Sequence, residues 1–143
     1  MSEEQVNNQE NQAEDVLNPE QRILPRDASA LDRAKMAGQI CADNRGRDIV
    51  ILDMRTLSTA FDYFVIASGS SRRQLHAMSE EIDRVFEKEM NDRRLGIEGY
   101  QDSRWILLDY GDVVVHLFVD EAREHFRLEE LWAAAPKVDF IPE

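Results

Sequence analysis

The chain has 143 residues, 43% of them apolar, which suits one domain with a hydrophobic core and a short tail. No apolar run approaches the roughly 20 residues that a membrane-spanning helix needs, and the acidic, amide-rich start resembles neither a secretory signal nor a transit peptide. The net charge of −12 argues against a protein that clamps nucleic acid, and the single cysteine fits a reducing compartment, so we expect a cytoplasmic protein.

The sequence predicts a folded domain over residues 28–136, between an acidic tail over 1–27 and a short polar C-terminal tail over 137–143. Residues 1–27 are expected to be disordered, because they are rich in acids and amides and show no apolar periodicity. Of the 29 acidic and 17 basic residues, seven and two fall in this first tail, so the domain itself is also acidic. This acidity either serves solubility or suits a basic protein partner, and charge alone leaves both readings open.

The first predicted elements are a helix and two strands. Ser29 is a good N-cap for a helix that ends near Asn44, and one face of this helix is apolar: Leu31, Ala34, Ala37, Ile40 and Cys41. On that face we expect the cysteine to be a small buried hydrophobe. Residues 48–52 and 62–67 are β-branched runs without clean polar alternation, which predicts two interior strands covered on both faces.

The clearest helix follows a turn at residues 68–71. Ser71 and Gln74 have the spacing of a capping box, in which each side chain binds a backbone N–H of the first turn. The helix then shows one apolar stripe with charges elsewhere: Leu75, Met78, Ile82, Val85 and Phe86. Glycines break the chain after it, and a short edge strand is expected around Ile97.

Residues 105–110 and 113–118 predict a β-hairpin, with Gly111 and Asp112 as its two-residue loop. The register that follows places a wholly apolar set on the core face: Ile106, Leu108, Tyr110, Val113, Val115 and Leu117. The opposite face, which we call the mixed face, carries aromatic and ionisable groups: Trp105, Leu107, Asp109, Val114, His116 and Phe118. Because buried charges are costly, we expect the mixed face to reach solvent or a protein interface, unless the last helix folds back over it.

The last predicted elements are two short helical segments. Asp120 is expected to cap a helix that ends near Phe126, and residues 128–135 to add another helical turn or two. Trp132 follows two glutamates in this segment. It either packs in the core or extends an acidic, aromatic interface.

Candidate catalytic groups do not combine into a site in the sequence. The Gly-Ser turn at residues 68–71 is similar to that of nucleotidyltransferases, but the paired carboxylates that those enzymes need on a following strand are missing. Asp109 and Asp112 straddle a tight turn, and the three histidines lack the spacing of metal ligands. We therefore predict no enzyme and no catalytic, cofactor-binding or metal-ligating residue. A nucleotidyltransferase-like enzyme stays the weaker alternative.

Several segments, in their order and spacing, resemble the Iojap family of ribosomal silencing factors. The resemblance spans residues 29–135, and its most specific parts are the Trp-to-His hairpin and the Leu-Glu-x-Leu-Trp ending. The matching segments are residues 48–53, 62–66, 68–71 with Gln74, 105–116 and 123–132.

The resemblance implies an α/β (α+β) fold, in which a mixed sheet of about five strands is flanked by helices, with the shape of a nucleotidyltransferase but without the catalytic acids. It implies a protein that binds large-subunit ribosomal protein fourteen, blocks association of the ribosomal subunits and represses translation when nutrients are scarce. Little direct RNA contact, no membrane contact and no cofactor are expected. A role in assembly of the large subunit stays open, as does a homodimer.

Seven residues are predicted to bind the partner. The resemblance supplies four of them: Trp105, Asp109, Tyr110 and Leu131. The mixed face and the acidic, aromatic ending supply three more: Leu107, His116 and Trp132. By the predicted register Tyr110 points to the core, so only its place near the turn favours contact with a partner. The family usually has tyrosine where this chain has Phe126, so the chain lacks a hydroxyl at that point.

Overall fold

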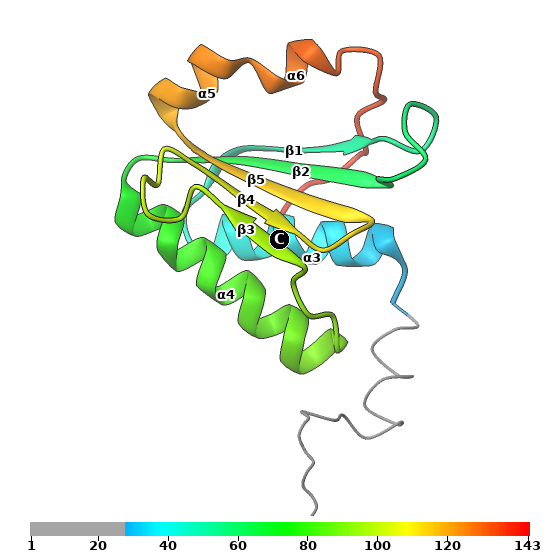
Figure 1. The fold of residues 1–143 in the computed structure, drawn as a ribbon, viewed down its shortest axis with the longest axis horizontal. Coiled ribbons are helices and arrows are strands. Elements are labelled where there is room, and N and C mark those ends of the chain that lie inside the picture. The colour runs from blue at the N-terminus through cyan, green and yellow to red at the C-terminus, as the bar shows by residue number, and fades with distance from the viewer. Residues whose placement is uncertain (1–27) are drawn as a thin grey trace, which may run out of the picture.

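The computed structural model describes residues 28–143, which form a mixed five-stranded sheet with helices on both faces (Figure 1). The mixed sheet predicted from the sequence is confirmed, whereas the predicted tail at 1–27 lies outside the described residues. The strand order is β1-β2-β5-β4-β3, and only the β2–β5 pair is parallel. The strands are β1 (Arg47–Asp53), β2 (Tyr63–Gly69), β3 (Gly96–Glu98), β4 (Trp105–Asp109) and β5 (Val113–Val119).

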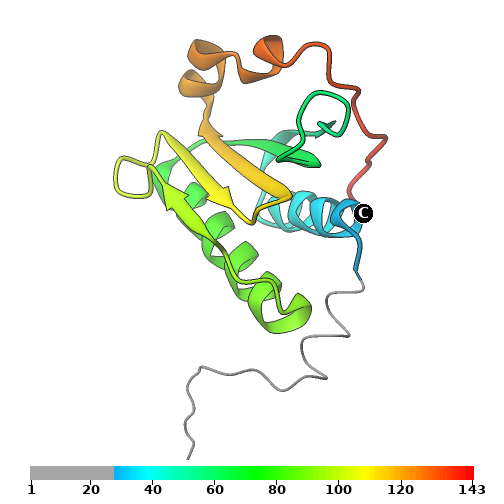
Figure 2. The ribbon, with the colours of Figure 1, turned by 45° about the vertical axis from the view of Figure 1, so that its right-hand side comes forward.

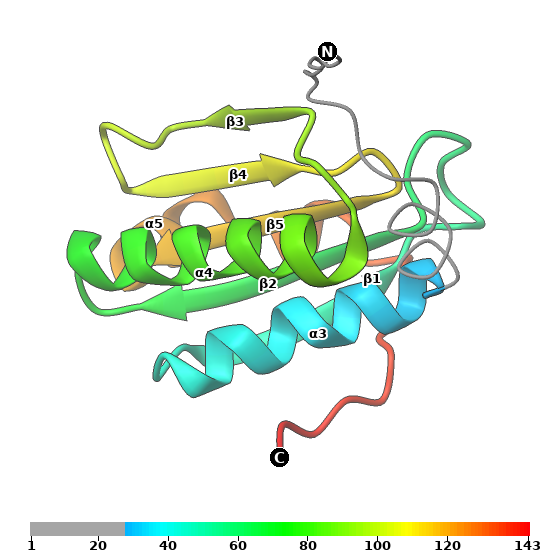
Figure 3. The ribbon, with the colours of Figure 1, turned by 90° about the horizontal axis from the view of Figure 1, so that it is seen from below.

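Two long helices cover one face of the sheet, α3 (Ala30–Asp43) and α4 (Arg72–Met90). In Figure 3 they lie side by side over the sheet and run roughly along its strands. Two short helices, α5 (Asp120–Phe126) and α6 (Leu128–Leu131), lie on the opposite side of the sheet (Figures 1 and 2). Within residues 28–143, no helix combines the length and the apolar character needed to cross a membrane.

The long helices begin where the sequence predicts. Ser29 accepts a hydrogen bond from the Asp32 N–H at 3.0 Å, and Ser71 accepts one from the Gln74 N–H at 3.1 Å. The second half of the predicted capping box differs, because the Gln74 side chain accepts from the N–H of Ser70, at 2.7 Å, and not from the cap residue. The turn at residues 68–71 is therefore tied to the first turn of α4.

The core under α3 and α4 confirms the predicted hairpin register. The Tyr110 N–H donates to the Val113 carbonyl at 2.9 Å, and all six residues predicted for the core face are buried. Cys41 is fully buried in the same core, and burial raises the pKa of its thiol to about 12. It is the small buried hydrophobe that the sequence predicts.

The prediction that both early strands are interior is wrong for β1, which lies at the edge of the sheet. Residues 136–138 run along part of this edge, where the Val138 N–H donates to the Ile51 carbonyl and the Asp53 N–H to the Pro136 carbonyl, both at 2.8 Å. Phe140 also packs against the core beside Gly38. The chain after residue 136 therefore packs on the domain and is not a separate tail.

The start of α5 also differs from expectation. Asp120 is the first residue of the helix and Val119 occupies the cap position without a side-chain hydrogen bond, so the predicted aspartate cap is wrong. Asp120 instead pairs with Arg47 at 2.6 Å. Arg127 joins α5 to α6 with a left-handed backbone, φ 50°, and this sharp turn lays both short helices on the same face of the sheet.

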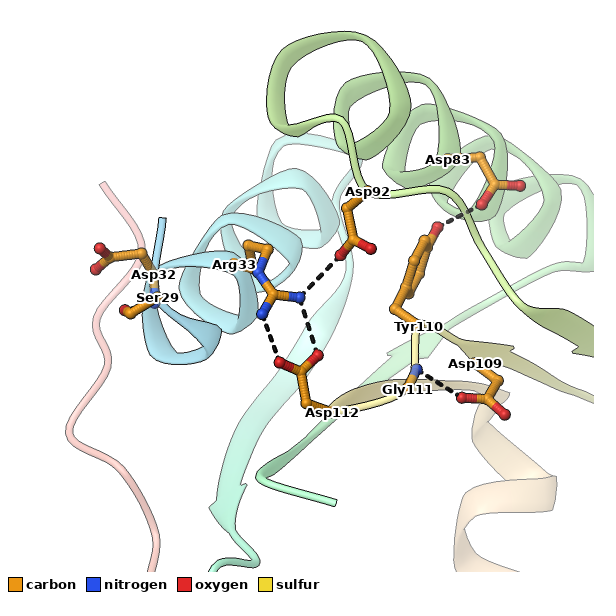
Figure 4. Close-up of polar contacts among 9 residues, drawn as sticks. All are labelled: Ser29, Asp32, Arg33, Asp83, Asp92, Asp109, Tyr110, Gly111 and Asp112. Carbon is orange, nitrogen blue, oxygen red and sulfur yellow. Dashed lines mark hydrogen bonds and ion pairs between the residues drawn. The ribbon is translucent and has the colours of Figure 1, made fainter. Parts of the chain in front are cut away.

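Replacing Arg33 should destabilise the domain by about 2 kcal/mol. Its guanidinium, 13% exposed, binds Asp92 at 2.8 Å and Asp112 at 2.6 Å, and so joins α3 to the end of α4 and to the hairpin turn (Figure 4). Arg33→Ala would leave two partly buried carboxylates without this cation. Urea unfolding measures the loss. Arg47→Ala, which breaks a half-exposed pair with Asp120, should destabilise the domain much less, and equal losses in the two variants would contradict this prediction.

Candidate protein-docking groove

A groove of about 720 Å³ lies on the side of the sheet that carries α5 and α6. It is formed where β3 and β4 meet the loop before β2 and the segment around α6. Its walls are mostly apolar, with two acidic residues and one histidine. The lining residues are Phe61, Phe64, Gly96, Ile97, Glu98, Gly99, Trp105, Leu107, Asp109, Val114, His116, Leu128 and Trp132.

Trp105 is one of two tryptophans of the groove that keep part of their surface exposed, the other being Trp132. The Trp105 ring lies 4.9 Å from the ring of Phe118 and 4.9 Å from that of Phe126. Phe118 is fully buried, whereas Phe126 is 45% exposed. Trp105 therefore packs on the buried Phe118 and lies beside the exposed Phe126. The part of its ring that stays exposed is available to a partner.

The mixed face of the hairpin is split between burial and exposure. Its three β5 residues, Val114, His116 and Phe118, are at most 3% exposed. Its three β4 residues are half-exposed: Trp105, Leu107 and Asp109. The sequence left two alternatives, an exposed mixed face or one covered by the last helix, and each holds for one strand. The helices α5 and α6 cover β5, whereas β4 forms the groove wall.

Asp109 lies on the groove wall near the hairpin turn. Its carboxylate accepts a hydrogen bond from the Gly111 N–H at 2.8 Å (Figure 4). Across residues 28–143, no ion pair involves Asp109 or the other acidic lining residue, Glu98. Both carboxylates therefore place uncompensated negative charge along the groove.

Tyr110 does not share the groove. It is 4% exposed, packs on Phe86 under the sheet, and donates its hydroxyl hydrogen to Asp83 on α4 (Figure 4). Burial raises the pKa of this hydroxyl, so it stays protonated. The structure makes Tyr110 part of the core, which agrees with the predicted register and gives it no direct route to a partner.

The two candidates from the chain ending have different surroundings. Trp132 lines the groove, and its ring meets that of Phe64 edge-on at 6.0 Å. Leu131 is 73% exposed on the outer side of α6 and is not part of the groove lining. A partner that fills the groove and spreads over α6 would contact both residues.

Several lining residues were missed by the sequence analysis. Phe64 and Ile97 were assigned only to strands and Leu128 only to a helix, and Phe61 was given no role. Alternation along β2 would have placed Phe64 on the same face as Ile66, which pairs with His116. No comparable signal exists for Leu128, because its position depends on how α6 returns to the sheet.

The Gly-Ser turn does not assemble a catalytic site. The Ser68 hydroxyl accepts from Arg123 at 2.9 Å, and that arginine also pairs with Glu129. Asp120, which lies near the same hollow, pairs with Arg47. Throughout the described part of the chain, no three His, Cys, Asp or Glu side chains are placed to hold a metal ion. This arrangement does not support the nucleotidyltransferase alternative.

Acid should destabilise the domain through His116. Burial lowers the pKa of this imidazole from 6.5 to about 3, so between these values the unfolded chain binds a proton that the folded protein does not. Stability is therefore lost as pH falls through this window, by about 2 kcal/mol between pH 7 and pH 5. Urea unfolding should show that His116→Phe lacks this component. An equal loss in both proteins would contradict the expected titration.

Comparison with known proteins identifies the family to which this chain is similar. The model of the family "Ribosomal silencing factor during starvation" matches residues 27–143. "Ribosomal silencing factor RsfS" of Bacillus subtilis is 42% identical over 106 residues, which are 73% of this chain and 88% of that protein. The mouse protein "Mitochondrial assembly of ribosomal large subunit protein 1" is 35% identical over 99 residues, covering 68% of this chain and 43% of its own.

The fold comparison agrees. A crystal structure of a protein from Chromobacterium violaceum matches with a TM-score of 0.69 and 32% identity, over 80% of this chain and 94% of that one. Sequence and structure lead to the same group of proteins, over most of the chain. The chain therefore belongs to the ribosomal silencing factor family.

Proposed function

We propose that this protein binds the large ribosomal subunit through the groove, with large-subunit ribosomal protein fourteen as its direct partner. Docking there keeps the small subunit from joining and represses translation under nutrient limitation. Family membership supports a function at the ribosome. The observation that carries the proposal is the groove, whose wall holds the partly exposed Trp105 at one end of β4 and, at the other end, Asp109, which makes no ion pair within residues 28–143.

The chemistry of the groove suits a basic protein better than RNA. Interface energy concentrates in a few aromatic anchors within partly desolvated pockets, and Trp105 and Trp132 provide two such anchors. Asp109 and Glu98 attract lysine and arginine but repel phosphates. The net charge of −12 also disfavours binding to nucleic acid, whose phosphates it repels.

Sedimentation with purified subunits tests the proposal. We expect the protein to migrate with isolated large subunits, not with small subunits, and to reduce the yield of joined ribosomes when added before mixing. Isolated ribosomal protein fourteen should compete for the protein and release it from the subunit. Co-migration with small subunits alone would contradict the proposal, and binding that ribosomal protein fourteen does not displace would contradict the named partner.

A second function, as an assembly factor for the large subunit, is favoured by one observation. The mouse relative carries large-subunit assembly in its name and is 35% identical over 99 residues. Docking of the same groove on immature particles would produce this function. Depleting the protein from cells separates the two: incomplete large subunits would accumulate if it acts in assembly, whereas excess joined ribosomes during starvation would indicate silencing.

A further inference from the structure

His116 occupies a buried position in the groove lining, 3% exposed, between Phe64 and Trp105. Only one of its two ring nitrogens has a partner. Trp105 donates its indole N–H to Nδ1 at 3.2 Å, so Nδ1 must carry a lone pair. The hydrogen of the neutral ring then lies on Nε2.

The Nε2–H group is a buried donor without an acceptor among residues 28–143. Buried polar groups in native proteins are nearly always hydrogen-bonded, and an exception needs an explanation. Retaining this unpaired group costs the free protein stability. His116 belongs to the lining of the groove, so a docked molecule is the natural source of the missing acceptor, although Nε2 itself is buried and the side chains over it must shift on docking.

We propose that His116 is a specificity-determining residue of the groove, whose Nε2–H donates to a neutral oxygen of the docked protein, most simply a main-chain carbonyl. The proposal rests on the proposed function and deepens it. The bound segment would be a basic loop, with its cationic side chains toward Asp109 and Glu98 and one carbonyl oxygen reaching the imidazole.

The surroundings decide which kind of acceptor fits. A carboxylate of the partner would be repelled by Asp109 and Glu98, the two acidic residues of the lining. A cation cannot accept a hydrogen bond and would be repelled by the positive end of the N–H dipole. A neutral carbonyl avoids both penalties, and a partner without one would leave the donor unpaired, which costs affinity.

Replacing the histidine should lower affinity while leaving stability nearly unchanged. His116→Phe removes the unpaired Nε2–H donor but also the acceptor of the Trp105 indole N–H, so the free protein should melt at about the same temperature. Its affinity for isolated ribosomal protein fourteen should fall about tenfold, because the partner's oxygen is then buried without a donor. His116→Gln keeps a neutral donor and a neutral acceptor on one side chain. It should bind within about threefold of wild type, which shows that the lost hydrogen bond matters and not the lost ring.

Nuclear magnetic resonance of the histidine-labelled protein detects the protonation of the His116 ring nitrogens directly. In the free protein, the nitrogen shifts should identify Nε2 as the protonated nitrogen and Nδ1 as the unprotonated one. On adding ribosomal protein fourteen, the Nε2 proton should move downfield and exchange more slowly with water. A proton on Nδ1, or an Nε2 proton that the partner leaves unchanged, would overturn the proposal even if His116→Phe failed to fold.

The outcomes separate this inference from the function on which it rests. If wild type binds and Trp105→Ala loses binding while His116→Phe binds like wild type, the groove is the docking site and the role of His116 is refuted. If wild type binds neither the large subunit nor ribosomal protein fourteen, the proposed function fails and the inference falls with it.

Discussion

Trp105→Ala should weaken binding to the large subunit by about 30-fold or more, while the domain stays folded. An aromatic anchor in a partly desolvated pocket contributes about 2 kcal/mol or more to binding, and Trp105 is a partly exposed aromatic of the groove. Its loss also removes contacts with Phe118 and Phe126, so some stability is lost as well. This loss should stay below the ~3–5 kcal/mol typical of a fully buried aromatic.

The matching measurements are affinity for large subunits and thermal melting of the same variants. Phe118→Ala is the control, since Phe118 is fully buried and should damage folding first. At Asp109, a lysine reverses the charge, whereas an asparagine keeps the oxygen that binds the Gly111 N–H. Lysine should therefore weaken binding much more than asparagine. If Trp105→Ala unfolds the domain, or binds like wild type, the groove is not the docking surface.

Gly99→Ala should destabilise the domain by about 3 kcal/mol and disable the groove. Gly99 has a φ of +77°, and an added Cβ would lie 2.0 Å from the Trp105 carbonyl oxygen. Both the left-handed backbone and the contact with main-chain atoms oppose any side chain there. Relief would require β3 and β4 to separate, which would move Trp105. We expect urea unfolding to show the loss of stability and sedimentation the loss of binding.

Gly96→Ala, at the first residue of β3, provides the control for this prediction, since Gly99 directly follows the same strand. An added Cβ at Gly96 meets no atom within 4 Å, and its φ is not in the left-handed region. Its stability should therefore change by less than about 1 kcal/mol. Similar losses in the two variants would mean that the segment tolerates no substitution at all, and that the close approach of Gly99 to Trp105 is not the cause.

The hairpin shows what local sequence determines well. A two-residue loop at Gly111 and Asp112 fixes the register, and the register fixes which side chains share a face. The core residues of the hairpin could be predicted for this reason, as could the helix stripe that ends at Phe86. Both depend only on residues that are near in the chain and on one repeat of side-chain direction, 2.0 residues in a strand or 3.6 residues in a helix.

The missed features depend on contacts between distant segments. Whether His116 is buried depends on where α5 and α6 pack, and alternation along β5 carries no information about that. The same holds for β1, where an apolar run indicated an interior strand although residues 136–138, more than 80 positions away, cover part of its edge. The ion pairs of Arg33 with Asp92 and Asp112 likewise join three elements that no sequence pattern connects.

The two edges of the sheet are not equivalent, and this limits how copies of the chain can associate. At β1, the register is interrupted between Arg47 and Val50, and residues 136–138 cover part of the remaining length. Such irregular, occupied edges do not accept a further strand. At β3, Gly96 to Glu98 pair only with β4 among the described residues. With one open edge in the part of the chain that the structure describes, pairing through edges would stop at two copies, so this fold resists growth into fibres.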